Sequence, residues 1–301
     1  MPFIPPTDDK ILGAFPELMD ITRFSGGGFK VVYRATLAAG IEVFKLVCLP
    51  QVGATDEERA LYRKEAMGRI RREVGLLAKC KRPELVKLGS VQPRLVTIDG
   101  VEYVGYTEEL VPGESLGQLI RRKGAKPDEA EARQLMLALL RAIEELWNDH
   151  RTVHRDIKPD NVMRTGDPGR PFILLDLGIA YGLYDTALTH DHGMGPFTPR
   201  YMAPEIARAD FRQNIDFRTD LYTTGLTVFE YSSQLHPLAK TRDDLIATIS
   251  RAIRQPPRPL KLDRPEFGDA LCALVDQMLK KKPMLRPSNV AALIADMEGG
   301  Q

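Results

Sequence analysis

Several features that would assign a protein to a class are scarce in this 301-residue chain. The three cysteines (Cys48, Cys80 and Cys272) are widely scattered and have neither metal-binding spacing nor the number needed for a disulfide framework. We therefore expect a reducing, cytoplasmic location. The longest apolar runs, such as Leu135–Leu140, are far too short to span a bilayer. The first residues lack the basic flank and apolar core of a signal peptide, so we expect none.

A strong charge of either sign is also missing. The 42 Lys and Arg residues are balanced by 41 Asp and Glu residues, which leaves a net charge of +1. Because there is no broad basic field, we expect neither nucleic acid nor an anionic membrane as a partner. The composition is 43% hydrophobic and 28% charged, which suits one large or two modest globular domains with a sizeable core.

The most distinctive stretch is His154-Arg155-Asp156-Ile157-Lys158-Pro159-Asp160-Asn161. Asp156 can accept a proton, Lys158 follows two positions later, and Asn161 follows five positions later. A loop with this content is able to hold an acceptor hydroxyl, a phosphate and a metal ion at one point.

This stretch matches the H-R-D-x-x-x-x-N signature and resembles the catalytic loop of the protein kinase family. Further kinase-like segments occur in the family's own order over about residues 19–297. They are a glycine-rich stretch, a strand lysine, a helix glutamate, a hinge, Asp176-Leu177-Gly178 and Thr198-Pro199-Arg200-Tyr201-Met202-Ala203-Pro204-Glu205.

The resemblance implies an α+β, two-lobed fold with ATP and Mg²⁺ as cofactors. We expect residues 1–18 to be an irregular lead-in. Residues 19–109 would form a lobe with a small five-stranded antiparallel sheet and one helix. Residues 110–301 would form a mainly helical lobe.

The resemblance also assigns roles to the charged residues of the stretch. Asp156 would orient and deprotonate the acceptor hydroxyl, and Lys158 would offset charge on the transferred γ-phosphoryl group. Asn161 and Asp176 would hold Mg²⁺. Leu177 replaces the usual phenylalanine of this motif but keeps a hydrophobic side chain.

Lys45 is the candidate for holding the α- and β-phosphates of ATP. It lies on an alternating, β-branched strand over 41–47. A capping box at Thr55 predicts a helix from about 56 to 80, and Glu73 near its end would pair with Lys45. The alternative is that Glu73 pairs with one of its neighbouring arginines on a solvated face.

The remaining nucleotide contacts are expected from the glycine-rich stretch, two valines and the hinge. Ser25 and Lys30 stand where the family has its first and third glycines. At the hinge, either Thr107 or Glu108 guards the pocket, and we favour Thr107 because a buried Glu108 without a partner would be costly. The expected contacts are Ser25, Gly26, Gly27, Gly28, Val32, Val43, Thr107, Glu109 and Val111.

Several structural expectations complete the interpretation. Asp99-Gly100 predicts a type I′ hairpin, and apolar periodicity predicts a helix over 128–147. The last helix should span about 287–298. By resemblance, Asp220 would anchor the catalytic loop, and Arg286 would pair with Glu205.

Lys158 and Thr198-Pro199 are similar to the Ser/Thr class of kinases, which implies protein substrates with serine or threonine acceptors. The first alternative is a pseudokinase that binds nucleotide or partners without turnover. The second is a small-molecule kinase of the aminoglycoside phosphotransferase type, which the Ala203-Pro204-Glu205 segment disfavours.

We predict that activity does not require phosphorylation of the activation segment. Gly193-Met194-Gly195 occupies the usual position of the activating hydroxyl, and Thr186 and Thr189 are the nearest candidates upstream. Phosphatase treatment followed by a kinase assay should leave the rate unchanged. A silenced enzyme would contradict this expectation.

Overall fold

The computed structural model describes residues 4–27, 30–49, 55–124, 126–177, 199–207, 215–240 and 243–299. The chain divides into two compact units. The first contains the chain up to Lys79 together with Val86–Val111, and the second contains Cys80–Leu85 and most of the chain after Val111.

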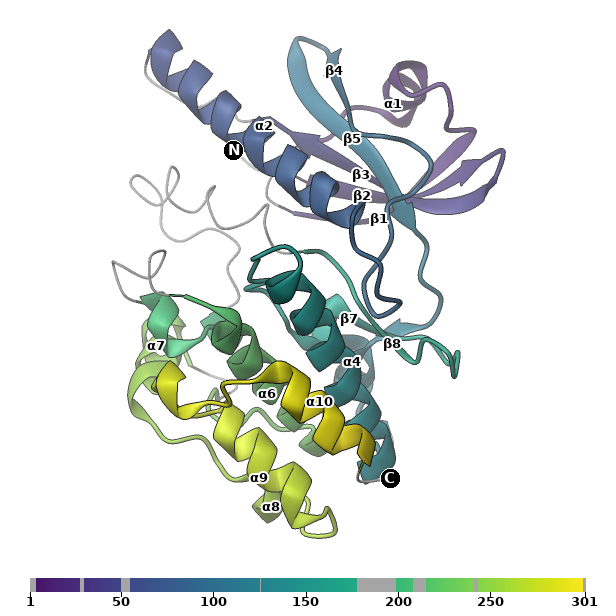
Figure 1. The fold of residues 1–301 in the computed structure, drawn as a ribbon. Coiled ribbons are helices and arrows are strands. Elements are labelled where there is room, and N and C mark those ends of the chain that lie inside the picture. Colours follow the sequence, from purple (N-terminus) through teal and green to yellow (C-terminus); the bar gives the residue numbers. More distant parts are fainter. Residues whose placement is uncertain are drawn as a thin grey trace. The chain divides into compact units, whose positions relative to one another are not determined.

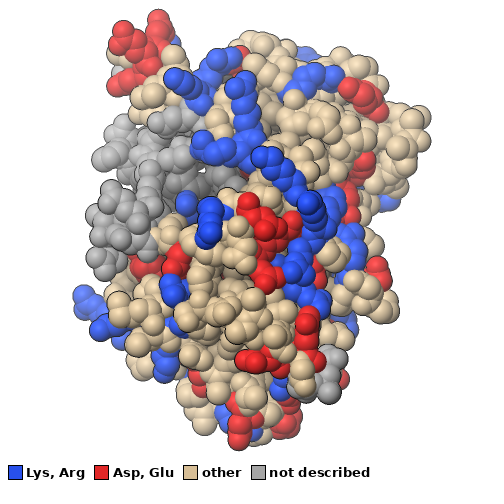
Figure 2. Space-filling view, viewed as in Figure 1, with Lys and Arg blue, Asp and Glu red and all other residues tan. Residues whose placement is uncertain are grey.

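No helix within the described ranges is both long and apolar enough to cross a membrane. On the face drawn in Figure 2, acidic and basic side chains are interspersed.

The first unit is built on a five-stranded antiparallel sheet (Figure 1) with the spatial order β1-β2-β3-β5-β4. This confirms the expected small sheet. At the turn between β4 and β5, Asp99 has φ 52° and Gly100 has φ 76°, as a type I′ turn requires. The strands are β1 (Asp20–Gly27), β2 (Lys30–Leu37), β3 (Gly40–Cys48), β4 (Arg94–Ile98) and β5 (Val101–Glu109).

The two faces of this sheet differ in burial. Tyr33 on β2 and Phe44 on β3 point into a hydrophobic core and are fully buried. Val32 and Val43 lie on the opposite face and are only half-buried. Because side chains alternate along a strand, the second face can present residues to a ligand while the first face stabilises the sheet.

Helix α1 (Asp8–Ala14) covers the core face of the sheet near β4 (Figure 1). Ile11 and Phe15 are fully buried in this core. Gly105 on β5 makes room for Phe15, since a Cβ atom at Gly105 would lie 2.3 Å from the Phe15 ring. The expectation of an irregular lead-in was therefore wrong, because two buried apolar side chains stabilise a short helix despite the prolines around it.

Helix α2 (Asp56–Leu77) has the predicted capping box, in which Thr55 Oγ1 accepts a hydrogen bond from the Glu58 N–H and Thr55 N–H donates to Glu58 Oε2. Its buried apolar side chains lie mainly in its second half. Ile70 is buried, whereas Leu61 is 53% exposed. The helix is tied to β5 by the ion pair of Arg63 with Glu102.

The second unit is mainly helical, as expected. Helix α6 (Phe217–Ser233) is buried along its length and packs against α4 (Glu129–Asn148) and α9 (Asp269–Met278). The other helices are α3 (Leu116–Arg122), α7 (Leu245–Arg254), α8 (Leu260–Asp263) and α10 (Val290–Gly299), with short 3₁₀ turns η1 (Pro159–Asn161), η2 (Pro199–Tyr201), η3 (Pro204–Ala207) and η5 (Pro283–Leu285). A small antiparallel sheet contains β6 (Glu114–Ser115), β7 (Val162–Arg164) and β8 (Phe172–Leu174).

Two predicted helix boundaries show how capping residues determine where a helix begins. Helix α4 matches the predicted range within one residue, and Asp128 accepts the hydrogen bond of the Glu131 N–H. The last helix begins at Val290 rather than at 287. Asn289 Oδ1 accepts the Ala292 N–H and so caps this helix later than predicted.

The predicted pair of Arg286 and Glu205 is confirmed. The guanidinium donates from both terminal nitrogens to the two carboxylate oxygens at 2.7 Å and 2.8 Å. The Arg286 side chain is fully buried and that of Glu205 is 8% exposed. This bidentate pair joins η3 to the segment before α10.

We predict that Arg286→Gln destabilises the protein by about 3–5 kcal/mol, because it leaves the Glu205 carboxylate buried without its charge partner. Chemical denaturation measures this free energy. The matched control is Arg122→Gln, which breaks the exposed pair with Glu114 (61% and 47% exposed side chains) and should cost less than about 1 kcal/mol. Equal losses in the two variants would contradict the prediction.

His236 links the end of α6 to η2. Its Nδ1 accepts the N–H groups of Leu238 at 3.1 Å and Ala239 at 2.8 Å. Its Nε2 donates to the Arg200 carbonyl at 2.8 Å. Burial lowers the pKa of His236 to about 3, and the nearby Arg200 charge contributes. A proton on Nδ1 would break both bonds that this atom accepts.

We predict that His236 makes the protein less stable in acid. The unfolded side chain binds a proton near pH 6.5 and the folded one only near the lowered pKa, about 3, so His236 loses stabilising free energy as pH falls from 6.5 to 3. Between pH 7 and pH 5 this loss amounts to about 2 kcal/mol.

The measurement compares wild type with His236→Asn, whose side-chain oxygen can replace Nδ1 as acceptor. The difference in free energy of unfolding between wild type and His236→Asn should be about 2 kcal/mol smaller at pH 5 than at pH 7. The comparison is needed because Asp220, whose pKa burial raises to about 7, acts in the opposite direction in both proteins. A difference that is constant with pH would contradict the prediction.

Candidate active site

The stretch His154–Asn161 folds into a loop of the second unit that ends in η1 and leads into β7. Lys158 Nζ lies 3.0 Å and 2.9 Å from the two carboxylate oxygens of Asp156. Asn161 Nδ2 donates to the Asp156 carbonyl and to Asp156 Oδ2, both at 2.8 Å. The structure therefore brings together the three polar residues whose spacing drew attention to this stretch.

The buried imidazole of His154 supports the loop from the interior of the second unit. His154 is fully buried, and its Nδ1 accepts the Asp156 N–H at 3.3 Å. Burial lowers the pKa of His154, which favours the neutral ring that this bond requires. The backbone of Asp156 is thereby fixed to the interior of the unit.

Asp220 on α6 anchors the loop, as predicted. Its two carboxylate oxygens accept the N–H groups of His154 at 2.7 Å and Arg155 at 2.8 Å. The side chain is almost fully buried, and burial raises its pKa to about 7, while these two N–H bonds act in the opposite direction. The loop is thus held by the central helix of the unit.

A backbone hydrogen bond from the segment just after β8 brings Asp176 close to the same loop. The Leu175 N–H, one residue before Asp176, donates to the Asn161 carbonyl at 2.8 Å. Asp176 has φ 52° and Arg155 has φ 69°. Backbone in this region costs a non-glycine residue about 1–3 kcal/mol, and such residues cluster at functional sites. Leu177 is fully buried, so the hydrophobe at this position does pack.

The donor groups at this loop fit a magnesium ion. Asn161 donates to Asp156 through its nitrogen, so its carboxamide oxygen, at about 120° from that nitrogen, is not the atom bonded to Asp156. Mg²⁺ is bound by oxygen ligands, chiefly carboxylates and carbonyl groups. Asn161 and Asp176 can supply one ligand of each kind.

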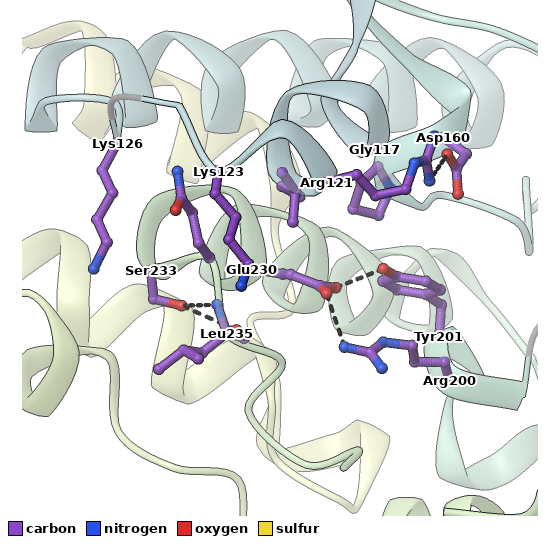
Figure 3. Close-up of a pocket in the computed structure, with 13 residues that line it drawn as sticks. Gly117, Arg121, Lys123, Lys126, Asp160, Arg200, Tyr201, Glu230, Ser233 and Leu235 are labelled. Carbon is purple, nitrogen blue, oxygen red and sulfur yellow. Dashed lines mark hydrogen bonds and ion pairs between the residues drawn. The ribbon is translucent and has the colours of Figure 1, made fainter. Parts of the chain in front are cut away.

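A pocket of ≈ 750 Å³ lies beside the loop within the second unit (Figure 3). Several of the charged side chains that line the pocket bond to one another or to a neighbouring hydroxyl. Arg121 donates to Asp160 at 2.8 Å. Glu230 accepts from Arg200 at 3.0 Å and from the Tyr201 hydroxyl at 2.5 Å. The pocket is lined by Gly117, Ile120, Arg121, Lys123, Lys126, Pro159, Asp160, Arg200, Tyr201, Glu230, Ser233, Gln234 and Leu235.

In the first unit, Lys45 is nearly fully buried on the sheet. Its Nζ lies 2.6 Å from Glu108 Oε1, and the two side chains are 6% and 4% exposed. Glu73 on α2 is also buried and accepts the Tyr106 hydroxyl at 3.2 Å. The pairing of Glu73 with Lys45 stays a prediction.

The register of β3 and β5 corrects the choice of Thr107 as the residue guarding the nucleotide. Glu108 is opposite Val43, and Thr107 is opposite the core residue Phe44. Opposite residues in an antiparallel pair share a face, so Thr107 points away from Lys45. Its hydroxyl accepts the Val91 N–H at 2.9 Å. The argument against Glu108 assumed a glutamate without a partner, and Lys45 is that partner.

The half-buried valines share the face of Lys45. Val32 is opposite Lys45 in the pairing of β2 with β3, and Val43 is two positions before Lys45 on β3. Ser25 is opposite Val32. The structure thus groups these predicted nucleotide contacts on one side of the sheet.

For the other predicted nucleotide contacts, the structure gives only part of the surroundings. Gly26 and Gly27 end β1, while Gly28 lies outside the described residues. Glu109 Oε1 accepts the Lys87 N–H at 2.9 Å, and Val111 is buried just after β5. Their nucleotide contacts remain predictions. Thr186 and Thr189 also lie outside the described residues.

Comparison with known proteins identifies the family. The family model described as "Protein kinase domain" matches residues 26–296. A probable serine/threonine-protein kinase, PknB, of Bifidobacterium longum is 31% identical over 216 residues, which cover 69% of this chain and 30% of that protein. A probable serine/threonine-protein kinase of Clostridium perfringens is 26% identical over 290 residues, covering 96% of this chain and 38% of that protein. The chain therefore spans less than half the length of these two relatives.

Solved structures share the fold. The structure of Rad53 in complex with AMP-PNP matches with a TM-score of 0.67 and 20% identity, covering 93% of this chain and 64% of that one. The kinase domain of Mycobacterium tuberculosis PknI matches with a TM-score of 0.62 and 20% identity, covering 94% and 96%. The matched family model, the two-unit α+β architecture and the loop built on Asp156 agree, and the chain belongs to the protein kinase family.

Proposed function

We propose that this chain transfers the γ-phosphoryl group of ATP to serine or threonine hydroxyls of protein substrates in the cytoplasm, with Mg²⁺ bound. The observation that carries the proposal is the Asp156 carboxylate, held by Lys158 and Asn161 on a loop anchored by Asp220. Phosphoryl transfer depends on such positioning and charge compensation more than on covalent catalysis.

Asp156 is the group that acts on the acceptor. Its carboxylate is 27% exposed, so a substrate hydroxyl can reach it, while Asn161 fixes its orientation. It orients the hydroxyl and accepts its proton as the oxygen attacks phosphorus. Lys158, beside both carboxylate oxygens, offsets negative charge on the group being transferred.

Asn161 and Asp176 are the residues proposed to hold the metal ion. When bound, Mg²⁺ neutralises charge on the phosphate oxygens. The amide oxygen of Asn161 and the carboxylate of Asp176 are suitable ligands, and the bond between Leu175 and Asn161 keeps their backbones adjacent.

Lys45 is proposed to bind the α- and β-phosphates. An ammonium group offers three N–H donors, so Lys45 can bond to a carboxylate and to phosphate oxygens together. Val32 and Val43 on the same face of the sheet supply apolar contact for the adenine base.

Protein substrates are supported by the protein kinase domain that matches residues 26–296, and the pocket beside the catalytic loop is a candidate site for part of such a substrate. This pocket adjoins Asp156 through Pro159 and Asp160, and it carries both charged and apolar lining residues. The similarity to bacterial serine/threonine-protein kinases supports serine and threonine as acceptors.

We predict that Asp156→Asn lowers phosphoryl transfer at least about 100-fold, because the amide cannot accept the acceptor's proton. ATP binding should persist, since Asp156 serves the hydroxyl rather than the nucleotide. Transfer from labelled ATP to generic protein substrates, and nucleotide binding, are measured side by side.

The matched control is Asp149→Asn, the same chemical change at an exposed residue just after α4. It should leave transfer unchanged. Transfer by Asp156→Asn at the wild-type rate would show that the role of Asp156 is wrong. A wild-type protein that binds nucleotide but transfers nothing would instead support the pseudokinase alternative.

A further inference from the structure

Lys45 has a buried partner besides the helix glutamate that the kinase pattern assigns to it. The Lys45 ammonium and the Glu108 carboxylate are 2.6 Å apart. Both side chains are more than nine-tenths buried, at 6% and 4% exposure. A charge in such a place is retained only when it is paired, and this contact gives each of the two groups a partner of opposite charge.

The sheet fixes this contact. Lys45 on β3 is opposite Tyr106 on β5, and Val43 is opposite Glu108. Residues two apart on a strand share a face, so Lys45 and Glu108 are diagonal neighbours on the same surface. Their backbones belong to paired strands in the middle of the sheet, which fixes the positions of the two Cα atoms relative to one another.

Tyr106 connects this pair to the helix. Its hydroxyl donates to Glu73 Oε1 at 3.2 Å, and its ring centroid lies 6.0 Å from Lys45 Nζ. Glu73 is therefore oriented by β5 as well as by α2. Glu108 is one carboxylate at hydrogen-bond distance from the Lys45 ammonium.

We propose that Glu108 is a positioning residue for Lys45 and orients its ammonium toward the phosphates of ATP. This inference rests on the proposed function of Lys45. A bond from one of its three N–H donors to Glu108 orients the whole ammonium group, so that the directions of its N–H groups are set before ATP binds. Glu108 acts through Lys45 and does not itself contact the phosphates.

The test is a double-mutant cycle on nucleotide binding with Glu108→Gln, Lys45→Met and the double variant. Glutamine keeps the size of glutamate and removes its charge. The dissociation constant is measured with mant-ATP and Mg²⁺, and thermal unfolding checks that each variant is folded. Glu108→Gln should weaken binding at least about tenfold. In the Lys45→Met background it should have no further effect.

The matched control is Glu102→Gln, which makes the same change on β5 but breaks a partly exposed pair with Arg63. It should bind mant-ATP like wild type. Steady-state kinetics then add a second readout, in which Glu108→Gln lowers kcat/KM for ATP as much as Glu73→Gln does or more.

Two results would overturn the inference. One is wild-type nucleotide affinity in Glu108→Gln, and the other is an equal loss of affinity with and without Lys45. If wild type binds mant-ATP but transfers no phosphate, the proposed function fails while the binding cycle still decides the role of Glu108. A wild type that binds no nucleotide overturns both.

Discussion

The catalytic loop is anchored by a buried carboxylate. Asp220, on the helix that the second unit packs around, accepts two consecutive backbone N–H groups of the loop. With these two amides fixed, the backbone reaches the left-handed conformation at Arg155 and turns Asp156 toward Lys158 and Asn161. Asp220 lies on α6, which is buried along its length. The packing of the core therefore fixes the geometry of the loop.

Much of the fold and of this loop could be predicted from the sequence because the signals are local. Within the eight residues from His154 to Asn161, Asp156 has Lys158 and Asn161 as hydrogen-bond partners. The capping box at Thr55 and the turn at Asp99-Gly100 each specify their own backbone. The pairs of Asp220 and of Arg286 are long-range, and they were accessible only through the resemblance to a family.

What could not be predicted depends on register between distant strands. Choosing between Thr107 and Glu108 required knowing which residue of β5 faces Lys45, and a shift of one residue exchanges the two faces. The desolvation argument was sound for a lone glutamate, but it treated Lys45 and Glu108 separately. A buried lysine on an apolar strand was itself a signal that a carboxylate should be sought on the neighbouring strand.

Helix α1 has a consequence for work with fragments of this chain. The family model begins at residue 26, yet Ile11 and Phe15 fill the core of the sheet before that point. A fragment trimmed to the family boundary would uncover Phe44 and the open space above Gly105. Such a fragment would expose an apolar surface that favours aggregation, so a soluble minimal kinase should start ahead of Asp8.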